Sequence, residues 1–199
     1  MKKRQAFFNQ AAENWDMQYD KPKLRDFLSK FVPSFGILSG QAVLDVGTGT
    51  GILIPFLLEA VGSKGHVTAI DYALSMVEIC KTKYAHLPNV SVMLSSSEDL
   101  QFAEASFDVV TCFGVFPHLD NKKVALKQFH MVLKSKGKLI IAHALSSAEV
   151  KSHHQNAGVV AYDLLPSRKD MEKLLLQAGF TEIEIVDKQG SYLCTSTKP

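Results

Sequence analysis

The 199-residue sequence has few cysteines, a small net charge and no long apolar run, and each of these features argues against a class of protein. Its three cysteines, Cys80, Cys112 and Cys194, lie far apart and form no Cys-x-x-Cys pair, which argues against a disulfide framework or a zinc knuckle. Reduced thiols in a cytoplasm are the simplest expectation. Because 22 basic residues face 20 acidic ones, the net charge of +2 lacks the strongly basic character of nucleic-acid-binding proteins.

Segments that would place the chain in or across a membrane are also missing from the sequence. No apolar run reaches the roughly 18 residues that a membrane-spanning helix needs, and no apolar signal segment follows the charged start. We therefore expect a cytoplasmic protein without stable membrane insertion. A chain of this length with 46% hydrophobic residues is sufficient for one compact domain with a sizeable core.

Short β-branched or apolar runs alternate with segments of helical periodicity along most of the chain. The runs predict five strands, at 42–46, 66–70, 90–94, 107–113 and 138–145. Helical periodicity predicts helices at 4–15, 22–32, 52–61, 73–85, 121–134 and 168–178. The segments 182–186 and 191–197 predict a closing antiparallel hairpin. This order indicates an α/β fold with a mostly parallel sheet, helices on both faces and an N-terminal helical cover.

A glycine-rich turn lies between the first predicted strand and the helix that follows it, in the run VLDVGTGTGI at 43–52. Glycine permits a sharp backbone turn and lets a ligand approach the backbone closely. The N-terminus of the next helix offers unpaired N–H groups and the positive end of a dipole. The turn therefore predicts a site for a phosphate or a carboxylate group.

A second feature, Asp71, directly follows the second predicted strand. Its distance from the glycine turn is close to the roughly 20-residue offset of an acid that binds ribose hydroxyls. The turn and the acid together predict an adenosine-containing cofactor. A dinucleotide is disfavoured, because the third glycine comes one residue early and Asp45 would oppose a pyrophosphate. The Asp45 carboxylate better suits a ligand with an amino group.

At these residues the chain resembles class I S-adenosylmethionine-dependent methyltransferases. The family's first two motifs are matched by VLDVGTGTG and HVTAIDYALSMVEICKTK. Two later segments, SSSEDLQFAEASFDVVTCFGVFPHL and LKSKGKLIIAHAL, extend the resemblance to about residues 40–146. The opening FFNQAAENWD is similar to the start of the subgroup that includes ubiquinone/menaquinone-biosynthesis methyltransferases. The fold implied is a Rossmann-like seven-stranded sheet of order 3-2-1-4-5-7-6, with the last strand antiparallel.

The resemblance implies a single methyltransferase domain over residues 1–199. A helical cover of 1–40 would precede a cofactor-binding core of 41–145. An acceptor-side insert of 146–166 and a helix with a closing hairpin at 167–199 would complete it. Because the cover is short and no separate RNA- or protein-recognition domain is visible, we expect a small-molecule acceptor and a monomer or homodimer.

Carried over by position, the resemblance gives the residues of the glycine turn and of the second motif a role toward S-adenosylmethionine. Asp45, Gly47, Thr48 and Gly49 would hold the methionine part. Asp71 would bind the ribose diol, which agrees with its spacing.

The adenine ring would be bound by residues of the second and third motifs. Tyr72 and Met76 would pack on the ring, and Ser97 would offer its backbone N–H. The sequence departs from the family at one position, because the acid for the adenine amino group falls at Ser96. Glu98, or the acid after it, would then replace that contact.

Three further residues are expected near the methyl group or the acceptor. Phe113, at the end of the fourth strand, would line the methyl-donor channel, and Tyr19 would donate to the methionine carboxylate. No catalytic triad is visible, and none is required, because orienting the nucleophile and the methyl group supplies much of the rate. A base is needed only if the nucleophile arrives protonated. His118 is the candidate base or substrate contact, although a histidine that caps loop backbone has the same pattern.

Two other functions remain open. A nicotinamide-dependent oxidoreductase shares the glycine turn and the acid, but Ile52 breaks the dinucleotide fingerprint and no Tyr-x-x-x-Lys pair is recognisable. A non-catalytic cofactor- or metal-binding accessory protein is supported only by the histidines between 118 and 154, whose spacings match no closed zinc pattern. We therefore predict a methyltransferase that uses S-adenosylmethionine, binds no metal and acts on a small apolar or aromatic molecule.

Overall fold

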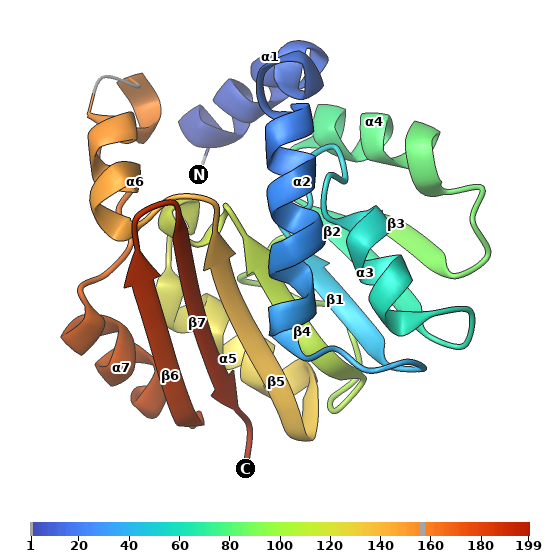
Figure 1. Cartoon of the computed structure of the whole chain (residues 1–199), viewed down its shortest axis with the longest axis vertical. Coiled ribbons are helices and arrows are strands. Elements are labelled where there is room, and N and C mark those ends of the chain that lie inside the picture. Colours follow the sequence, from blue (N-terminus) through green and yellow to red (C-terminus); the bar gives the residue numbers. More distant parts are fainter. Residues whose placement is uncertain (1, 156–157) are drawn as a thin grey trace. The chain divides into compact units, whose positions relative to one another are not determined.

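The computed structural model describes residues 2–155 and 158–199 and shows a seven-stranded sheet (Figure 1). The strand order is β3-β2-β1-β4-β5-β7-β6, which confirms the order that the family resemblance implied. The chain divides into two compact units, Met1–Ser96 and Ser97–Pro199. Whether the two act as a single functional domain stays a prediction.

The first unit contains the three parallel strands that carry the glycine turn and Asp71. Its strands are β1 (Ala42–Val46), β2 (His66–Asp71) and β3 (Val90–Leu94). Its helical elements are α1 (Lys2–Tyr19), α2 (Pro22–Phe31), η1 (Val32–Phe35), α3 (Ile54–Val61) and α4 (Leu74–Tyr84). Most of β1 and β2 is buried, as expected for parallel strands covered on both faces.

The first long helix after the glycine turn begins two residues later than its periodicity predicts. The turn extends to Leu53, and α3 starts at Ile54 with Pro55 in its first turn. Proline is tolerated there because the first N–H groups of a helix have no intrahelical acceptor.

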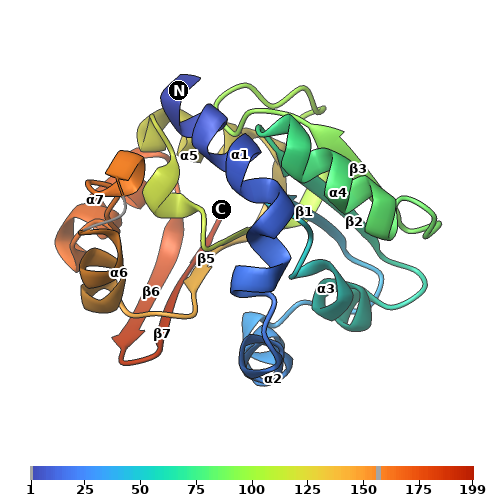
Figure 2. The same cartoon turned by 90° about the horizontal axis from the view of Figure 1, so that it is seen from above.

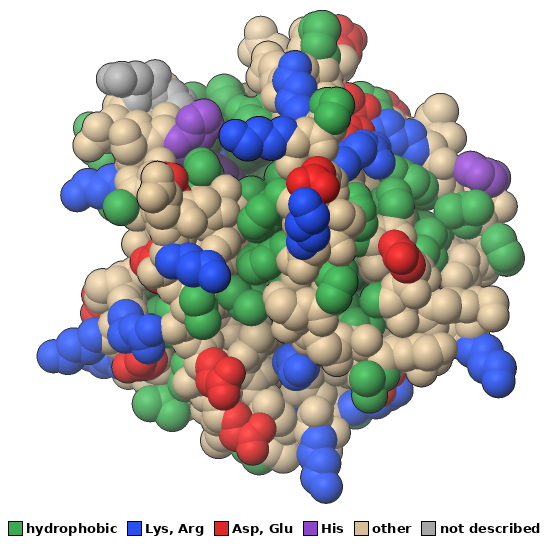
Figure 3. All heavy atoms as spheres, in the orientation of Figure 1, with side chains coloured by type: hydrophobic (Ala, Val, Ile, Leu, Met, Phe, Trp, Pro, Cys, Tyr) green, Lys and Arg blue, Asp and Glu red, His purple; other side chains and the backbone are tan. Residues whose placement is uncertain are grey.

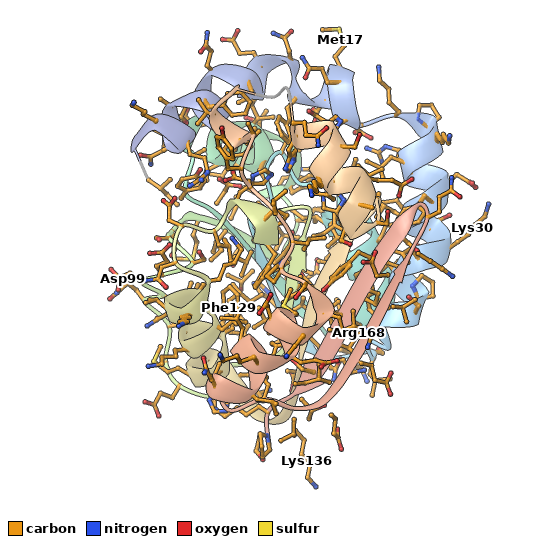
Figure 4. All side chains as sticks on the ribbon, turned by 90° about the vertical axis from the view of Figure 1, so that its left-hand side faces the viewer. Met17, Lys30, Asp99, Phe129, Lys136 and Arg168 are labelled. Atoms are coloured by element: carbon orange, nitrogen blue, oxygen red, sulfur yellow. The ribbon has the colours of Figure 1, made fainter. Side chains whose placement is uncertain are left out.

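The second unit contains the other four strands and the proposed acceptor side. Its strands are β4 (Phe107–Phe113), β5 (Leu133–His143), β6 (Thr181–Lys188) and β7 (Ser191–Thr197). Its helical elements are η2 (Phe116–His118), α5 (Lys122–Val132), α6 (Ser147–His154), η3 (Gly158–Val160) and α7 (Arg168–Gln177). Strand β7 is antiparallel to both β5 and β6, so the predicted closing hairpin is confirmed. Figure 4 shows Phe129 of α5 inside this unit, where it is fully buried.

One prediction about β5 is wrong. The residues Ser-Lys-Gly at 135–137, which lie between the predicted helix 121–134 and the predicted strand 138–145 and are typical of a turn, are part of the strand, which starts at Leu133 instead of Lys138. Leu133 pairs with Phe107, and the register shifts before Lys138 pairs with Val109. The backbone bends at this irregularity, where Lys136 has a positive φ of 63°, and the strand pairing resumes after it.

The predicted insert at 146–166 is anchored to the hairpin, although its positions 156 and 157 lie outside the described residues. Helix α6 begins with a capping box in which Ser146 and Glu149 satisfy each other's backbone N–H groups. The Glu149 carboxylate also accepts from the backbone N–H of Gly190 at 2.8 Å, and these hydrogen bonds lower its pKa. In the described ranges, no helix combines the length and apolar character needed to cross a membrane.

Candidate cofactor and acceptor site

The glycine turn after β1 has a backbone conformation that favours glycine. Gly47 and Gly49 have φ angles of 69° and 56°, in the left-handed region that side chains rarely adopt. The N–H groups of Gly47 and Thr48 both donate to the carbonyl of Ile70, at 2.8 and 3.0 Å, and so tie the turn to β2. Asp45, just before the turn, is 1% exposed.

Glycine at position 51 is required for packing against α4. A Cβ atom at this position would lie 2.5 Å from Cε2 of Tyr84 and 2.9 Å from Sγ of Cys80, both on α4. The structure thus gives a packing reason for glycine at this position, and the approach of a ligand to the turn stays a prediction. The absent side chain lets α4 pack against the turn.

Asp71 connects the glycine turn to the start of α4. Its Oδ2 atom accepts from the backbone N–H of Gly49 at 2.9 Å, and Oδ1 accepts from that of Ala73 at 2.9 Å. Burial raises the pKa of this carboxyl, while the hydrogen bonds from Ala73, Gly49 and Tyr72 oppose the rise. A carboxylate has about four acceptor positions, so these bonds are compatible with additional hydrogen bonds from a ribose diol.

A pocket of about 240 Å³ lies next to Asp71 in the first unit. It is lined by Gln5, Tyr72, Leu94, Ser95 and Ser96. Tyr72 and Ser96 are two of the residues predicted at the adenine, and they do lie together here. An aromatic ring, an apolar side chain and hydroxyl groups suit a flat heterocycle with polar edges.

Helix α1 covers the glycine turn and runs beside α4 (Figure 2). The Trp15 Nε1 atom lies 3.6 Å from where a Cβ atom of Gly49 would be. Tyr19, predicted at the methionine carboxylate, is 39% exposed, and its ring centroid lies 4.3 Å from that of Trp15. Met76, predicted at the adenine, is 1% exposed in a cluster with Ala12 of α1. For Met76 to contact the adenine as predicted, the adenine ring would have to reach the space beneath α1.

Two side chains of α1 that the sequence did not single out hold this helix in place. Asp16 accepts from the Thr50 hydroxyl at 2.5 Å and forms an ion pair with Lys83 of α4. Burial raises the pKa of Asp16, but the bonds from Lys83 and Thr50 outweigh it, and the pKa lies below its ordinary value. Gln5 donates to the carbonyl of Tyr72 at 2.6 Å.

In the second unit, the acid expected to compensate for Ser96 has another contact. Glu98 accepts from the backbone N–H of Asn121 at 2.7 Å, at the start of α5. Its neighbour Asp99 accepts from Gln101 at 2.6 Å. Ser97 is half-buried beside them. The structure gives Glu98 a capping role, and its contact with adenine stays a prediction.

His118 is held by a carboxylate that the sequence did not reveal. Its Nδ1 atom lies 2.8 Å from Oδ2 of Asp163, and the two side chains are 12% and 7% exposed. The Nδ1 atom of His154 lies 2.6 Å from the carbonyl oxygen of Asp163, and the rings of His118 and His154 are 5.0 Å apart. Histidine side chains gather beside α6 at the molecular surface (Figure 3).

His143 and Phe113 complete this group at the ends of β5 and β4, with ring centroids 6.5 Å apart. Burial, and then the nearby His118, His154 and His153, lower the pKa of His143 to about 4. His143 is therefore neutral near pH 7. Within residues 2–155 and 158–199, no three His, Cys, Asp or Glu side chains form a group suited to a metal ion.

The pKa of His143 predicts a pH-dependent stability. Because its ordinary value is 6.5, the unfolded chain binds more protons than the folded one as pH falls from 6.5 toward 4. Stability is thus lost with falling pH, and His143 contributes about 2 kcal/mol of loss between pH 7.5 and 5. Urea unfolding of wild type and His143→Gln at both pH values measures the difference. The exposed His153→Gln is the control, and an equal pH dependence in His143→Gln and wild type would contradict the assignment.

Comparisons with known proteins agree with these features. Residues 43–137 match a family model described as a methyltransferase domain. A demethylmenaquinone methyltransferase of Staphylococcus aureus is 36% identical over 111 residues, which is 56% of this chain and 46% of that protein. The protein of the same name from Staphylococcus epidermidis is 36% identical over 107 residues, 54% of this chain and 44% of that protein.

The match to a solved structure extends over nearly the whole chain. A SAM-dependent methyltransferase from Aquifex aeolicus has a TM-score of 0.75 and 25% identity, with 92% of this chain and 96% of that chain covered. By contrast, the chain spans less than half the length of the two Staphylococcus relatives. The strand order, the glycine turn bonded to Asp71 and these matches together show that residues 43–137 carry a methyltransferase domain and that the chain has the fold of class I S-adenosylmethionine-dependent methyltransferases.

Proposed function

We propose that this chain transfers a methyl group from S-adenosylmethionine to a small apolar or aromatic acceptor. The observation that carries the proposal is the hydrogen bond between Asp71 and the backbone of Gly49. This bond joins the predicted ribose acid to the turn predicted to hold the methionine part. The adjacent pocket at Tyr72 and Ser96 supports an adenine position.

Each part of the cofactor has a matching group in the chain. S-adenosylmethionine supplies an electrophilic methyl group when bound. The buried Asp45 carboxylate suits the methionine amino group, and Asp71 suits the ribose diol. Trp15 of α1 lies over the turn at Gly49, and the Tyr19 ring packs against Trp15. Rate enhancement then comes mainly from orienting the acceptor against the methyl group.

The acceptor class is proposed from the relatives and from the second unit. The two Staphylococcus proteins are named as demethylmenaquinone methyltransferases, which favours a quinone-like ring. Phe113, half-buried at the end of β4, provides an apolar ring there, and the fully buried Phe116 packs in the core behind the strand end. We further propose a cytoplasmic monomer or homodimer that binds no nucleic acid.

Calorimetric titration of the purified chain with S-adenosylmethionine, S-adenosylhomocysteine and NAD tests the cofactor. Micromolar affinity for both sulfur ligands and none for NAD is the expected result. Binding of NAD alone would support the oxidoreductase alternative and overturn the proposal. Methyl transfer is then measured with reduced 1,4-naphthoquinone as the probe acceptor, by following the formation of S-adenosylhomocysteine.

A further inference from the structure

The second unit places an ordered imidazole and carboxylate pair at the carboxyl ends of β4 and β5. Phe113 ends β4, and His143 ends the neighbouring β5. His118 follows β4 within one short helix. In open α/β sheets, ligands lie outside the carboxyl ends of the strands. These side chains are thus at the edge where an acceptor is expected.

The contact between His118 and Asp163 determines which nitrogen accepts a proton. An ionised carboxylate only accepts hydrogen bonds, so Nδ1 of His118 carries the hydrogen in the 2.8 Å contact with Oδ2. The lone pair of the neutral ring then lies on Nε2. This tautomer is the one suited to remove a proton from a substrate.

The backbone of Asp163 is itself held by hydrogen bonds on both sides. Its backbone N–H donates to the carbonyl of Val160 at 3.0 Å. Its carbonyl oxygen accepts from Nδ1 of His154 at 2.6 Å, and His154 is 6% exposed. Because both backbone hydrogen-bonding groups of Asp163 are held, its buried carboxylate is placed against the His118 ring. Asp163 therefore acts as a positioning residue.

A second observation at His143 points to a ligand. Its Nδ1 atom is buried, and among the described residues it has no hydrogen-bond partner. A buried polar atom without a partner costs free energy, and native proteins seldom leave one unsatisfied. Because this ring is neutral near pH 7, it suits a polar group on a bound ligand rather than a counter-ion.

The charged and titratable groups around His118 come from every element packed against it. Asp163 faces it from the segment after η3, His154 from α6, and His143 from β5, whereas His153 is exposed and its ring contact is with His154. Lys122 of α5 also lies near, with its ammonium bonded to the carbonyls of Pro117 and Leu119. Asp163 is the anion in contact with the ring, and it stabilises the imidazolium that forms when the ring accepts a proton.

Resting on the proposed methyltransferase function, we propose that His118, positioned by Asp163, removes the hydroxyl proton of a phenolic or hydroquinone acceptor. The acceptor class is thereby narrowed to aromatic rings that carry an ionisable O–H. His143 provides a second polar contact to the same ring. The apolar wall of Phe113 packs on its face.

The proposed step balances as a proton transfer followed by methyl transfer. Nε2 of His118 takes the hydroxyl proton, and the O–H bonding pair stays on oxygen or delocalises to the ring carbon beside it. The atom that bears this pair bonds the methyl carbon while the C–S bond breaks toward sulfur. If carbon is methylated, its hydrogen moves to the oxygen. The imidazolium then returns its proton to solvent.

The test uses 7-hydroxycoumarin, whose ionised form absorbs at longer wavelength than its neutral form. The full chain is saturated with S-adenosylhomocysteine, and the spectrum of the bound probe is recorded at constant pH. We expect the ratio of ionised to neutral probe to rise about tenfold on binding to wild type, which equals one pKa unit. His118→Gln should abolish the rise, Asp163→Asn should reduce it, and the exposed His153→Gln should retain it.

Nitrogen NMR of the imidazole rings separates positioning from a merely structural role. Wild type should show His118 protonated at Nδ1, and Asp163→Asn should shift it toward a mixture of tautomers while the chain stays folded. Failure of wild type to bind or ionise the probe, or equal ionisation in His118→Gln, would overturn the proposal. A single tautomer retained in Asp163→Asn would do so as well. If S-adenosylhomocysteine itself fails to bind, the proposed function fails, which is a separately observed result.

Discussion

Replacing Asp71 with alanine is expected to raise the Kd for S-adenosylhomocysteine about 100-fold. Hydrogen bonds to a charged carboxylate contribute about 1.5–3 kcal/mol each, and the upper part of that range corresponds to two orders of magnitude in Kd. The same carboxylate accepts from the backbones of Gly49 and Ala73, so its loss also loosens the turn that would hold the methionine part. Isothermal calorimetry measures the change in affinity.

Asp71→Asn separates the two effects of this substitution. Asparagine keeps one acceptor oxygen for the turn but loses the charge, so a smaller, about tenfold loss of affinity is expected. Asp26→Ala is the control, since it removes an exposed carboxylate from the same unit. Thermal unfolding shows whether each variant is folded. Wild-type affinity in folded Asp71→Ala would remove Asp71 from the cofactor site.

Much of the fold was predictable because its signals are local. The run AVLDV at 42–46 is too short and too apolar for a surface helix, and it forms the buried strand β1 as predicted. The order of strands and helices then limits the topology, because parallel strands need crossover connections. At 135–137 the local sequence indicated a turn, and this was wrong. Ser-Lys-Gly is typical of a turn, but the long-range pairing of Leu133 with Phe107 keeps it in β5.

The candidate site was less predictable, because its contacts join residues far apart in sequence. Gly47, Gly49 and Asp71 follow a known spacing, and the structure brings Gly49 and Asp71 into contact. Asp163 has no such signal, since its role arises from the folding of the insert against η2. Asp16 likewise reads as one of many surface acids until α1 packs near Thr50.

Gly51→Ala is expected to lower the free energy of unfolding by about 4 kcal/mol. Alanine at a φ of 91° is strained by about 1–2 kcal/mol. Its Cβ would also lie 2.5 Å from the Tyr84 ring, and overpacking of this kind costs about 1–3 kcal/mol. Urea unfolding followed by circular dichroism measures the total.

Gly40→Ala is the matched control for Gly51→Ala, because the two positions share the backbone strain but differ in their surroundings. Gly40 has a φ of 86° in the same unit, and a Cβ there would meet nothing within 4 Å. It should therefore lose only the 1–2 kcal/mol of strain. In a chain that already carries Tyr84→Ala, the substitution Gly51→Ala should lower the free energy of unfolding by less than it does in wild type, because the clashing ring is absent. If Gly40→Ala and Gly51→Ala lose equal amounts of free energy of unfolding, then backbone strain, and not the packing of α4, is the reason that glycine is required at position 51.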